Sequence, residues 1–188
     1  MATVKIHGHG YQTVKVLEGI VNAIPGHLND GVLQHGTLAI SATTDRYKTT
    51  TELFFRKDGI QHQLAATDNC EFFAAYKVNN AAAAPLVYGA FLVEATGLIT
   101  PTITAKAVSS DQVYTTAALA IAALPTVTAG SVAIGYIVVG ANISSAWTAN
   151  TDDLIAGSDC ASVSFVNTTI NSIADINDTA GADGASAQ

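Results

Sequence analysis

Short β-prone runs separated by turn residues are the feature that most constrains the fold of this chain. They follow one another between residues 37 and 166, with Gly, Pro, Asn and Asp at the breaks. Antiparallel strands can be joined by tight turns, whereas parallel strands need a connection of about a dozen residues or more, so this pattern favours antiparallel sheets over β-α-β units. We predict a mainly β fold, an antiparallel β-sandwich or a partly open barrel, with one short α-helix.

Two hairpins are predicted from their turn chemistry. The first covers residues 51–65 and turns at a Lys-Asp-Gly triplet, where Gly59 can adopt the positive φ that a tight turn requires. The second has strands at residues 86–93 and 98–105 and a turn at residues 94–97. Pro101 lies in this return strand and lacks an amide hydrogen, so we expect an edge or a bulge there.

One segment is predicted to be helical. Residues 115–124 begin with threonines that can cap a helix, continue with an alanine-rich body and stop before Pro125. An isolated helix of this length does not hold in water. We therefore expect Leu119, Ile121 and Leu124 to pack it onto a sheet.

Two apolar segments and both cysteines are assigned to the core. Residues 131–139 form an uninterrupted apolar run that indicates a buried strand, and residues 161–166 alternate as a half-buried strand does. Cys70 and Cys160 are far apart in the sequence and lack the spacing of a metal site or a disulfide framework. We expect them to be ordinary small core residues.

The two ends of the chain differ in composition from the β-rich domain predicted at residues 37–170. Residues 1–36 hold four of the five histidines, six glycines and one strand-like stretch, residues 13–21, and we interpret them as an N-terminal arm. Residues 171–188 are small and acidic, with too little apolar area to offset the entropy lost on ordering. We predict that this C-terminal tail is flexible.

Charge is scarce and unevenly placed. Charged residues make up 12% of the chain and apolar residues 49%, about half the charged share of an average soluble domain. Such a surface favours burial against copies of the chain or a larger lattice. All eight Lys and Arg lie at or before Lys106 together with eight acids, so the remaining seven acids carry the net charge of −7. The later half cannot neutralise phosphates, and we expect no nucleic-acid partner.

Neither a signal peptide nor a membrane span is predicted. The chain starts Met-Ala-Thr-Val-Lys-Ile-His, without the apolar stretch of a secretion signal. Its apolar runs are shorter than the roughly 18 residues needed to cross a bilayer. We therefore expect synthesis in the cytoplasm and no membrane partner.

The N-terminal histidines have a spacing that some metal sites use. His7 and His9 point to the same side of an extended strand, and His27 and His35 can join them. Neither a carboxylate nor a cysteine lies beside them, so we expect a glycine-spaced arm with histidines on its surface or at a subunit contact. Their clustering leaves open a pH response near neutrality.

Residues 150–159 offer several oxygen ligands of the kind that calcium prefers. Asn150, Asp152, Asp153 and Asp159 lie within ten residues, but their spacing is not that of the helix-flanked calcium loop. We expect these side chains to shape the loop instead. Trp147 is either a sugar platform or, as we expect, a large plug closing one end of the sandwich.

Patterns of catalytic residues are missing from the sequence. There is no Gly-x-Ser-x-Gly elbow, no phosphate-binding glycine loop and no paired Cys and His. Asp152 and Asp153 lack a nearby Glu that could act as the acid of a glycosidase. We expect no enzymatic activity, no catalytic or metal-binding residues and no cofactor.

Residues 115–165 resemble a recurrent module of tailed-bacteriophage structural proteins. The module has an alanine-rich helix ending in Pro, here Pro125, then a Val-Gly-Tyr strand and a loop of the type Trp-Thr-Ala-Asn-Thr-Asp-Asp, which starts here at Trp147. Upstream, Lys-Thr-Thr-Thr, Asp-Gly-Ile and Ala-Ala-Thr-Asp-Asn segments fit the same order, so the resemblance covers residues 38–167. Residues 1–36 depart from it.

The resemblance implies a capsid decoration, or cement, protein. Such a protein would bind the major capsid protein on the outer surface of the virion and clamp neighbouring capsomers. Because residues 1–36 are spaced by glycines and depart from the module, we expect them to form the capsid contact. The protein would also be a homo-oligomer, with a trimer favoured over a dimer. The alternatives are a head-fibre or tail-fibre subunit that binds host carbohydrate and a phage-encoded hydrolase. The long repeats of a fibre and the convergent catalytic set of a hydrolase are both missing from the sequence.

Overall fold

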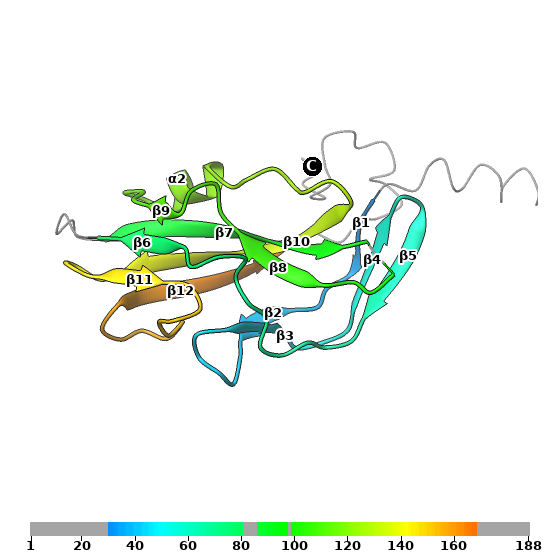
Figure 1. Ribbon diagram of the computed structural model, residues 1–188, viewed down its shortest axis with the longest axis horizontal. Helices are drawn as coiled ribbons and strands as arrows, with labels where there is room; N and C mark the ends of the chain where they lie inside the picture. Colours follow the sequence, from blue (N-terminus) through cyan, green and yellow to red (C-terminus); the bar gives the residue numbers. More distant parts are fainter. Residues whose placement is uncertain (1–29, 81–85, 98, 169–188) are drawn as a thin grey trace, which may run out of the picture.

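The computed structural model describes residues 30–80, 86–97 and 99–168 (Figure 1). The strands are β1 (Gly31–Gln34), β2 (Leu38–Ile40), β3 (Tyr47–Thr49), β4 (Leu53–Lys57), β5 (Ile60–Leu64), β6 (Lys77–Asn79), β7 (Val87–Thr96), β8 (Ile103–Lys106), β9 (Asp111–Gln112), β10 (Ser131–Ala141), β11 (Ala146–Thr148) and β12 (Cys160–Asn167); the helix is α2 (Ala117–Ala122). The predicted strand at residues 13–21 and the predicted tail lie outside the described residues.

The predicted mainly β fold is confirmed, and its sheets are sandwich-like rather than closed into a barrel. A central sheet has the order β12-β10-β7-β8, and each neighbouring pair in it is antiparallel. Three smaller sheets have the orders β1-β4-β5, β2-β3 and β11-β6-β9. In Figure 1 the long strands β7, β10 and β12 run along the molecule, with α2 beside β7 and β10.

The main core fills the space between the central sheet and the three smaller sheets. Phe91 of β7 is fully buried there and meets the rings of Phe72 and Trp147 at centroid distances of 5.0 and 5.6 Å. Tyr47 of β3 meets Phe72 edge-on at 5.4 Å. Edge-to-face contacts of this kind add to the stabilisation from burial alone. This aromatic cluster ties the central sheet to β3 and β11.

A bulge in β10 sets which of its side chains enter the main core. The register with β7 shifts between Ala133 and Gly135, so Ile134 and Ile137 both face the main core although they are three positions apart, an offset that would put them on opposite faces of a regular strand. Gly135 lies at this point because a Cβ there would stand 2.3 Å from the backbone oxygen of Val166. Only glycine allows β10 and β12 to approach this closely.

The first predicted hairpin is confirmed. β4 and β5 pair from Leu53 opposite Leu64 to Lys57 opposite Ile60, and two residues form the turn. Asp58 and Gly59 have φ angles of 52° and 77°, the positive values that a two-residue hairpin turn needs.

The second predicted hairpin exists, but its turn was misplaced. β7 continues through the predicted turn to Thr96, and β8 begins only at Ile103. Residues 94–96 stay extended because they pair with β10 on one side, and Glu94 and Ala95 also pair with β8 on the other. Pro101 lies before β8 rather than in the strand, and the pairing of β8 with β7 has no bulge. The predicted edge position agrees with the place of β8, which is the last strand of the central sheet.

The predicted helix is confirmed in a shorter form. The side chain of Thr116 caps α2 by accepting a hydrogen bond from the amide of Leu119 at 3.2 Å. Leu119 was predicted to face the sheet but is 53% exposed. Ala120 is buried instead, and it packs with Ile121 and Leu124 against Ala90 of β7. A small residue at the contact lets so short a helix lie close to the sheet.

The remaining core predictions are confirmed. β10 is buried along nearly its whole length, and β12 alternates between half-buried and exposed residues. Cys70 and Cys160 are free and buried.

Residues 31–34 fall inside the segment interpreted as an arm, yet they form β1 and pair with β4. Within the described ranges, no helix has the length and apolar character to cross a membrane.

Candidate functional site

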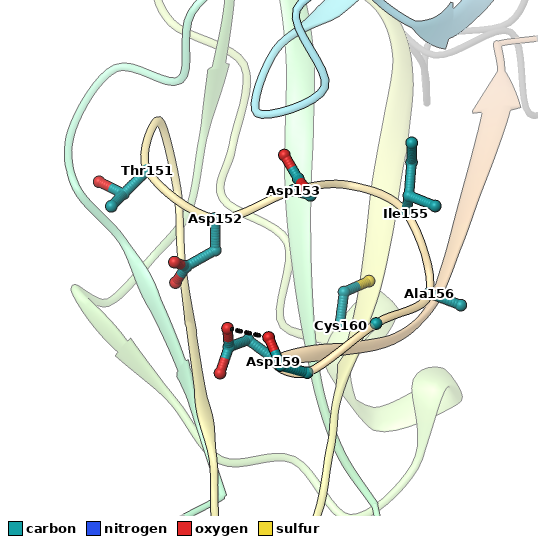
Figure 2. A pocket seen from close by; sticks show the side chains of 9 residues that line it. Thr151, Asp152, Asp153, Ile155, Ala156, Asp159 and Cys160 are labelled. Atoms are coloured by element: carbon teal, nitrogen blue, oxygen red, sulfur yellow. Dashed lines mark hydrogen bonds between the residues drawn. The ribbon is translucent and has the colours of Figure 1, made fainter.

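The loop between β11 and β12 is the candidate site that the sequence singled out. Residues 151–153 and 155–160 line a hollow of about 260 Å³ (Figure 2). Figure 2 shows the carboxylates of Asp152 and Asp159 on the inner side of the loop, whereas Asp153 points toward another segment.

Trp147 lies beneath this loop and is fully buried. Its indole N–H donates to the backbone oxygens of Asp152 and Asp153, each at 3.1 Å. Its ring contacts Phe72 and Phe91 edge-on. The predicted plug is confirmed, and the sugar-platform alternative is wrong because no face of the ring is open.

The two adjacent aspartates hold different parts of the loop. Asp152 accepts a hydrogen bond from the amide of Thr148 at 2.6 Å, which closes a turn after β11. Asp153 accepts a hydrogen bond from the hydroxyl of Thr44, and the amide of Leu154 donates to the backbone oxygen of Thr44 at 2.7 Å. The second contact ties the loop to the segment between β2 and β3.

Asn150 and Asp159 also form hydrogen bonds that hold the loop in place. Asn150 has a φ of 62°, and its side chain bonds both the amide and the oxygen of Phe72 at 2.9 Å. Asp159 accepts hydrogen bonds from the hydroxyls of Ser145 and Ser158, and these bonds hold the pKa of its carboxyl below the usual value. Together with the aspartate contacts, these bonds support the predicted loop-shaping role.

The carboxylates of this loop are not arranged as ligands of a metal ion. Side-chain or backbone donors already bond Asp152, Asp153 and Asp159. Across the described ranges, no three His, Cys, Asp or Glu side chains gather closely enough to hold a metal ion. His35 is half-buried in the link between β1 and β2. The other three histidines of the predicted N-terminal group, His7, His9 and His27, lie outside the described residues.

A second hollow, which we did not predict from the sequence, lies over β7 and β8. Its volume is about 650 Å³, and it is lined by Phe73, Tyr76, Glu94, Thr96, Thr102, Thr104, Lys106, Ala107, Thr128 and Ser131. Glu94 is buried at its base and forms an ion pair with Lys106 at 3.1 Å. The same carboxylate accepts a hydrogen bond from the amide of Thr128 at 3.0 Å, and Lys106 donates to the Thr128 hydroxyl.

Phe73 gives this hollow an exposed aromatic wall. Phe72 forms a bridge with Ala105 of β8, and the amide of Phe73 donates to the oxygen of Ala105 at 2.8 Å. Consecutive side chains of an extended segment point to opposite sides. Phe72 therefore enters the core at 2% exposure, while Phe73 stays 76% exposed.

One sequence signal for this hollow was available. Thr102, Thr104 and Lys106 recur with period two, which puts their side chains on one face of a strand. Glu94 stands at the end of an apolar run, where it was assigned to a turn. A charged residue that remains inside a strand and is buried there needs a partner of opposite charge.

The two thiols are not poised for chemistry. Burial, and secondarily the negative charge of Asp68, raise the pKa of Cys70 from 9.0 to about 11. Burial also raises the pKa of Cys160. Both therefore stay protonated at neutral pH, and the thiolate is the reactive form.

Comparisons of the chain with protein-family models, curated proteins and solved structures find no match.

Proposed function

We propose that this chain is a tailed-phage virion protein that binds the outer capsid surface and stabilises the head without catalysis. The observation that carries the proposal is the apolar surface of a charge-poor β body. In the described part of the chain, the exposed large apolar residues are Ile60, Phe73, Ile99, Val108, Val113, Leu119, Ile143, Ile155 and Val166. The resemblance of residues 38–167 to phage structural proteins supports the capsid as the surface that is bound.

Burial of such side chains provides the binding energy. Phe73, Ile99 and Val113 are each more than half exposed. Full burial of one side chain of this size contributes about 1.5–3 kcal/mol relative to full exposure. Because the contact repeats over a shell of identical subunits, modest affinity at each site gives a large collective effect.

Stabilisation then follows from mass action. A protein that binds the assembled shell but not its separate subunits stabilises each site by about 2.7 kcal/mol at a hundredfold excess over the dissociation constant. The major capsid protein is the proposed partner, and no step of this mechanism needs a metal ion or a cofactor.

Heat-induced DNA release from decorated and stripped heads at matched salt tests the proposal. Decorated heads should release DNA at a higher temperature, and adding purified protein back to stripped heads should restore the difference. Identical release curves would contradict the proposal. Chelator should leave the curves unchanged.

The N-terminal segment is the proposed capsid contact. The truncation that tests it should remove residues 2–29 and keep β1, because β1 pairs with β4. The truncated protein should stay folded by circular dichroism but fail to bind stripped heads. Undiminished binding would move the contact to the β domain.

A carbohydrate-binding fibre subunit is the second candidate, and the hollow beside Phe73 favours it. An exposed ring next to threonine hydroxyls and Lys106 offers both stacking and hydrogen bonding to a sugar. If this candidate is right, Phe73→Ala should abolish binding to host surface glycans, whereas the Leu119→Ala control should not. Equal glycan binding by both variants, or none by the parent protein, would exclude this candidate.

A further inference from the structure

The two edges of the central sheet differ in how they are covered. At one edge, the segment holding Phe72 and Phe73 bridges to β8 through Ala105. At the other edge, β12 pairs with β10 on its inner side only. Near its end, Asn167 accepts a hydrogen bond from the amide of Leu38 at 3.0 Å, so β2 caps the last residue of the strand.

The ladder between β10 and β12 fixes which backbone groups of β12 face outward. The amide of Thr168 bonds the oxygen of Ile134 at 3.1 Å, immediately beyond the pair of Gly135 and Asn167. Hydrogen-bonded and non-hydrogen-bonded pairs alternate along an antiparallel ladder. Ser164 and Val166 therefore bond to β10, while the amides and oxygens of Val163 and Phe165 point away from it. Throughout the described ranges, these outward groups form no hydrogen bond.

This edge lacks the features that keep strands from pairing between molecules. β12 reads Cys-Ala-Ser-Val-Ser-Phe-Val-Asn, without a charge or a proline. Lysines, prolines and bulges are the usual protection of exposed edges. The bulge in this ladder lies between Gly140 and Ala141, at the start of β12 and away from its middle. The middle of the strand is thus a regular, uncharged template for another strand.

We propose that β12 pairs antiparallel with β12 of a second copy across a two-fold axis at Ser164. In this register Val163 of each copy lies opposite Phe165 of the other, and their outward backbone groups bond in both directions. Ser164 lies opposite its own counterpart. The pairing is self-complementary, as a two-fold contact requires. It joins the two central sheets into one continuous sheet.

The side chains fit the same register. Val163 and Phe165 are partly buried against the main core. Pairing with a second copy covers their remaining exposed surface with another valine and phenylalanine, a favourable cross-strand combination. On the opposite face, Ser162 and Ser164 are exposed and uncharged, so no like charges meet. A two-fold contact yields a dimer and thus replaces the trimer expected from the sequence.

Charge variants at the axis test the pairing in solution. By sedimentation equilibrium at micromolar concentration, the full chain should have the mass of a dimer. Ser164→Lys and Ser164→Glu each place two like charges side by side and should each weaken the dimer about fivefold or more. Mixing the two variants should restore a heterodimer. Ser110→Lys, at another exposed serine, is the matched control and should leave the dimer intact.

A cross-link gives a second measurement. Residues opposite each other in a non-hydrogen-bonded pair have Cα atoms about 4.5 Å apart, within the range of a disulfide. Ser164→Cys should therefore form a covalent dimer under mild oxidation, while Ser110→Cys should form little. The buried Cys70 and Cys160 are not accessible to join such a cross-link.

Three results would overturn the pairing. They are a monomeric or trimeric parent protein, a Ser164→Lys variant that is folded by circular dichroism yet remains a dimer, and equal cross-linking of the two cysteine variants. All these measurements use purified protein without capsids. Their outcome is therefore independent of whether the chain stabilises a phage head.

Discussion

Glu94 and Lys106 show how a charge-poor chain accommodates charge inside its sheet. The buried carboxylate is paired with the ammonium of Lys106 and accepts a hydrogen bond from the amide of Thr128, and the ammonium also donates to the Thr128 hydroxyl. Arg46 and Glu71 form the contrasting pair at 3.3 Å, in which the glutamate is 67% exposed. A buried pair is costly to break from one side, whereas an exposed pair contributes little.

Replacing Glu94 by Gln should therefore destabilise the fold by about 3 kcal/mol, because it leaves the ammonium of Lys106 without its counter-charge. Glu71→Gln should change stability by less than about 0.5 kcal/mol. Urea denaturation followed by tryptophan fluorescence measures both. Equal effects of the two substitutions would show that the Glu94 pair is no more important than a surface pair.

Cys70 should make stability fall at alkaline pH. Its pKa is about 11 in the folded chain against 9.0 for a free thiol, so folding favours the protonated form. This contribution is complete below about pH 9 and is lost as the pH rises toward 11. Urea midpoints of Cys70→Ala should decline less steeply than those of the parent between pH 8 and 11. Parallel declines would contradict the assignment.

Among the secondary-structure elements, one hairpin turn was predicted correctly from its residues and the other was misplaced. The Asp58-Gly59 turn could be read from the sequence because both residues tolerate the positive φ that the turn needs. The turn expected at residues 94–97 failed because pairing with β10 and β8 keeps the chain extended there. Local preference yields when two neighbouring strands supply hydrogen bonds.

In the candidate site, too, features that depend on local residue type could be predicted, whereas features that depend on pairing between strands could not. The loop-shaping role of Asp152 was predictable from residue type, since Asx side chains bond nearby backbone. Asn150 instead bonds the backbone of Phe72, which is distant in sequence. The hollow over β7 and β8 was not predictable, because it depends on the register that places Lys106 beside the strand of Glu94. Register between strands is a long-range property that no single segment encodes.

Among the glycines in the described ranges, Gly135 is the one at which an added Cβ would make the closest contact. Gly135→Ala introduces a Cβ 2.3 Å from the oxygen of Val166 and should push β12 away from β10, with a loss of about 2 kcal/mol or more. Gly157→Ala is the control, because the nearest atom to its Cβ would be 3.6 Å away. Thermal unfolding of the two variants compares them. Similar melting temperatures would mean that β12 shifts at little cost.

For the whole molecule, self-pairing and stability should be linked. If β12 joins two copies, the folded state is favoured by association and the melting temperature should rise with protein concentration. Calorimetry over a hundredfold concentration range should show this rise for the parent protein but a much weaker one for Ser164→Lys. A melting temperature that does not change with concentration would separate stability from association.

The pairing of β6 with β11 has a consequence for how the chain is made. Val78 lies opposite Trp147, and Thr44 bonds Asp153, so the core closes only with residues that emerge late from the ribosome. A growing chain adds about 5–20 residues per second, and its early strands must wait several seconds for Trp147 to arrive. Folding is therefore completed only after Trp147 and Asp153 have been synthesised. Until then, Phe72 and Phe91 lack the indole ring that they contact in the folded chain, and chaperones that shield apolar segments have their best opportunity to bind.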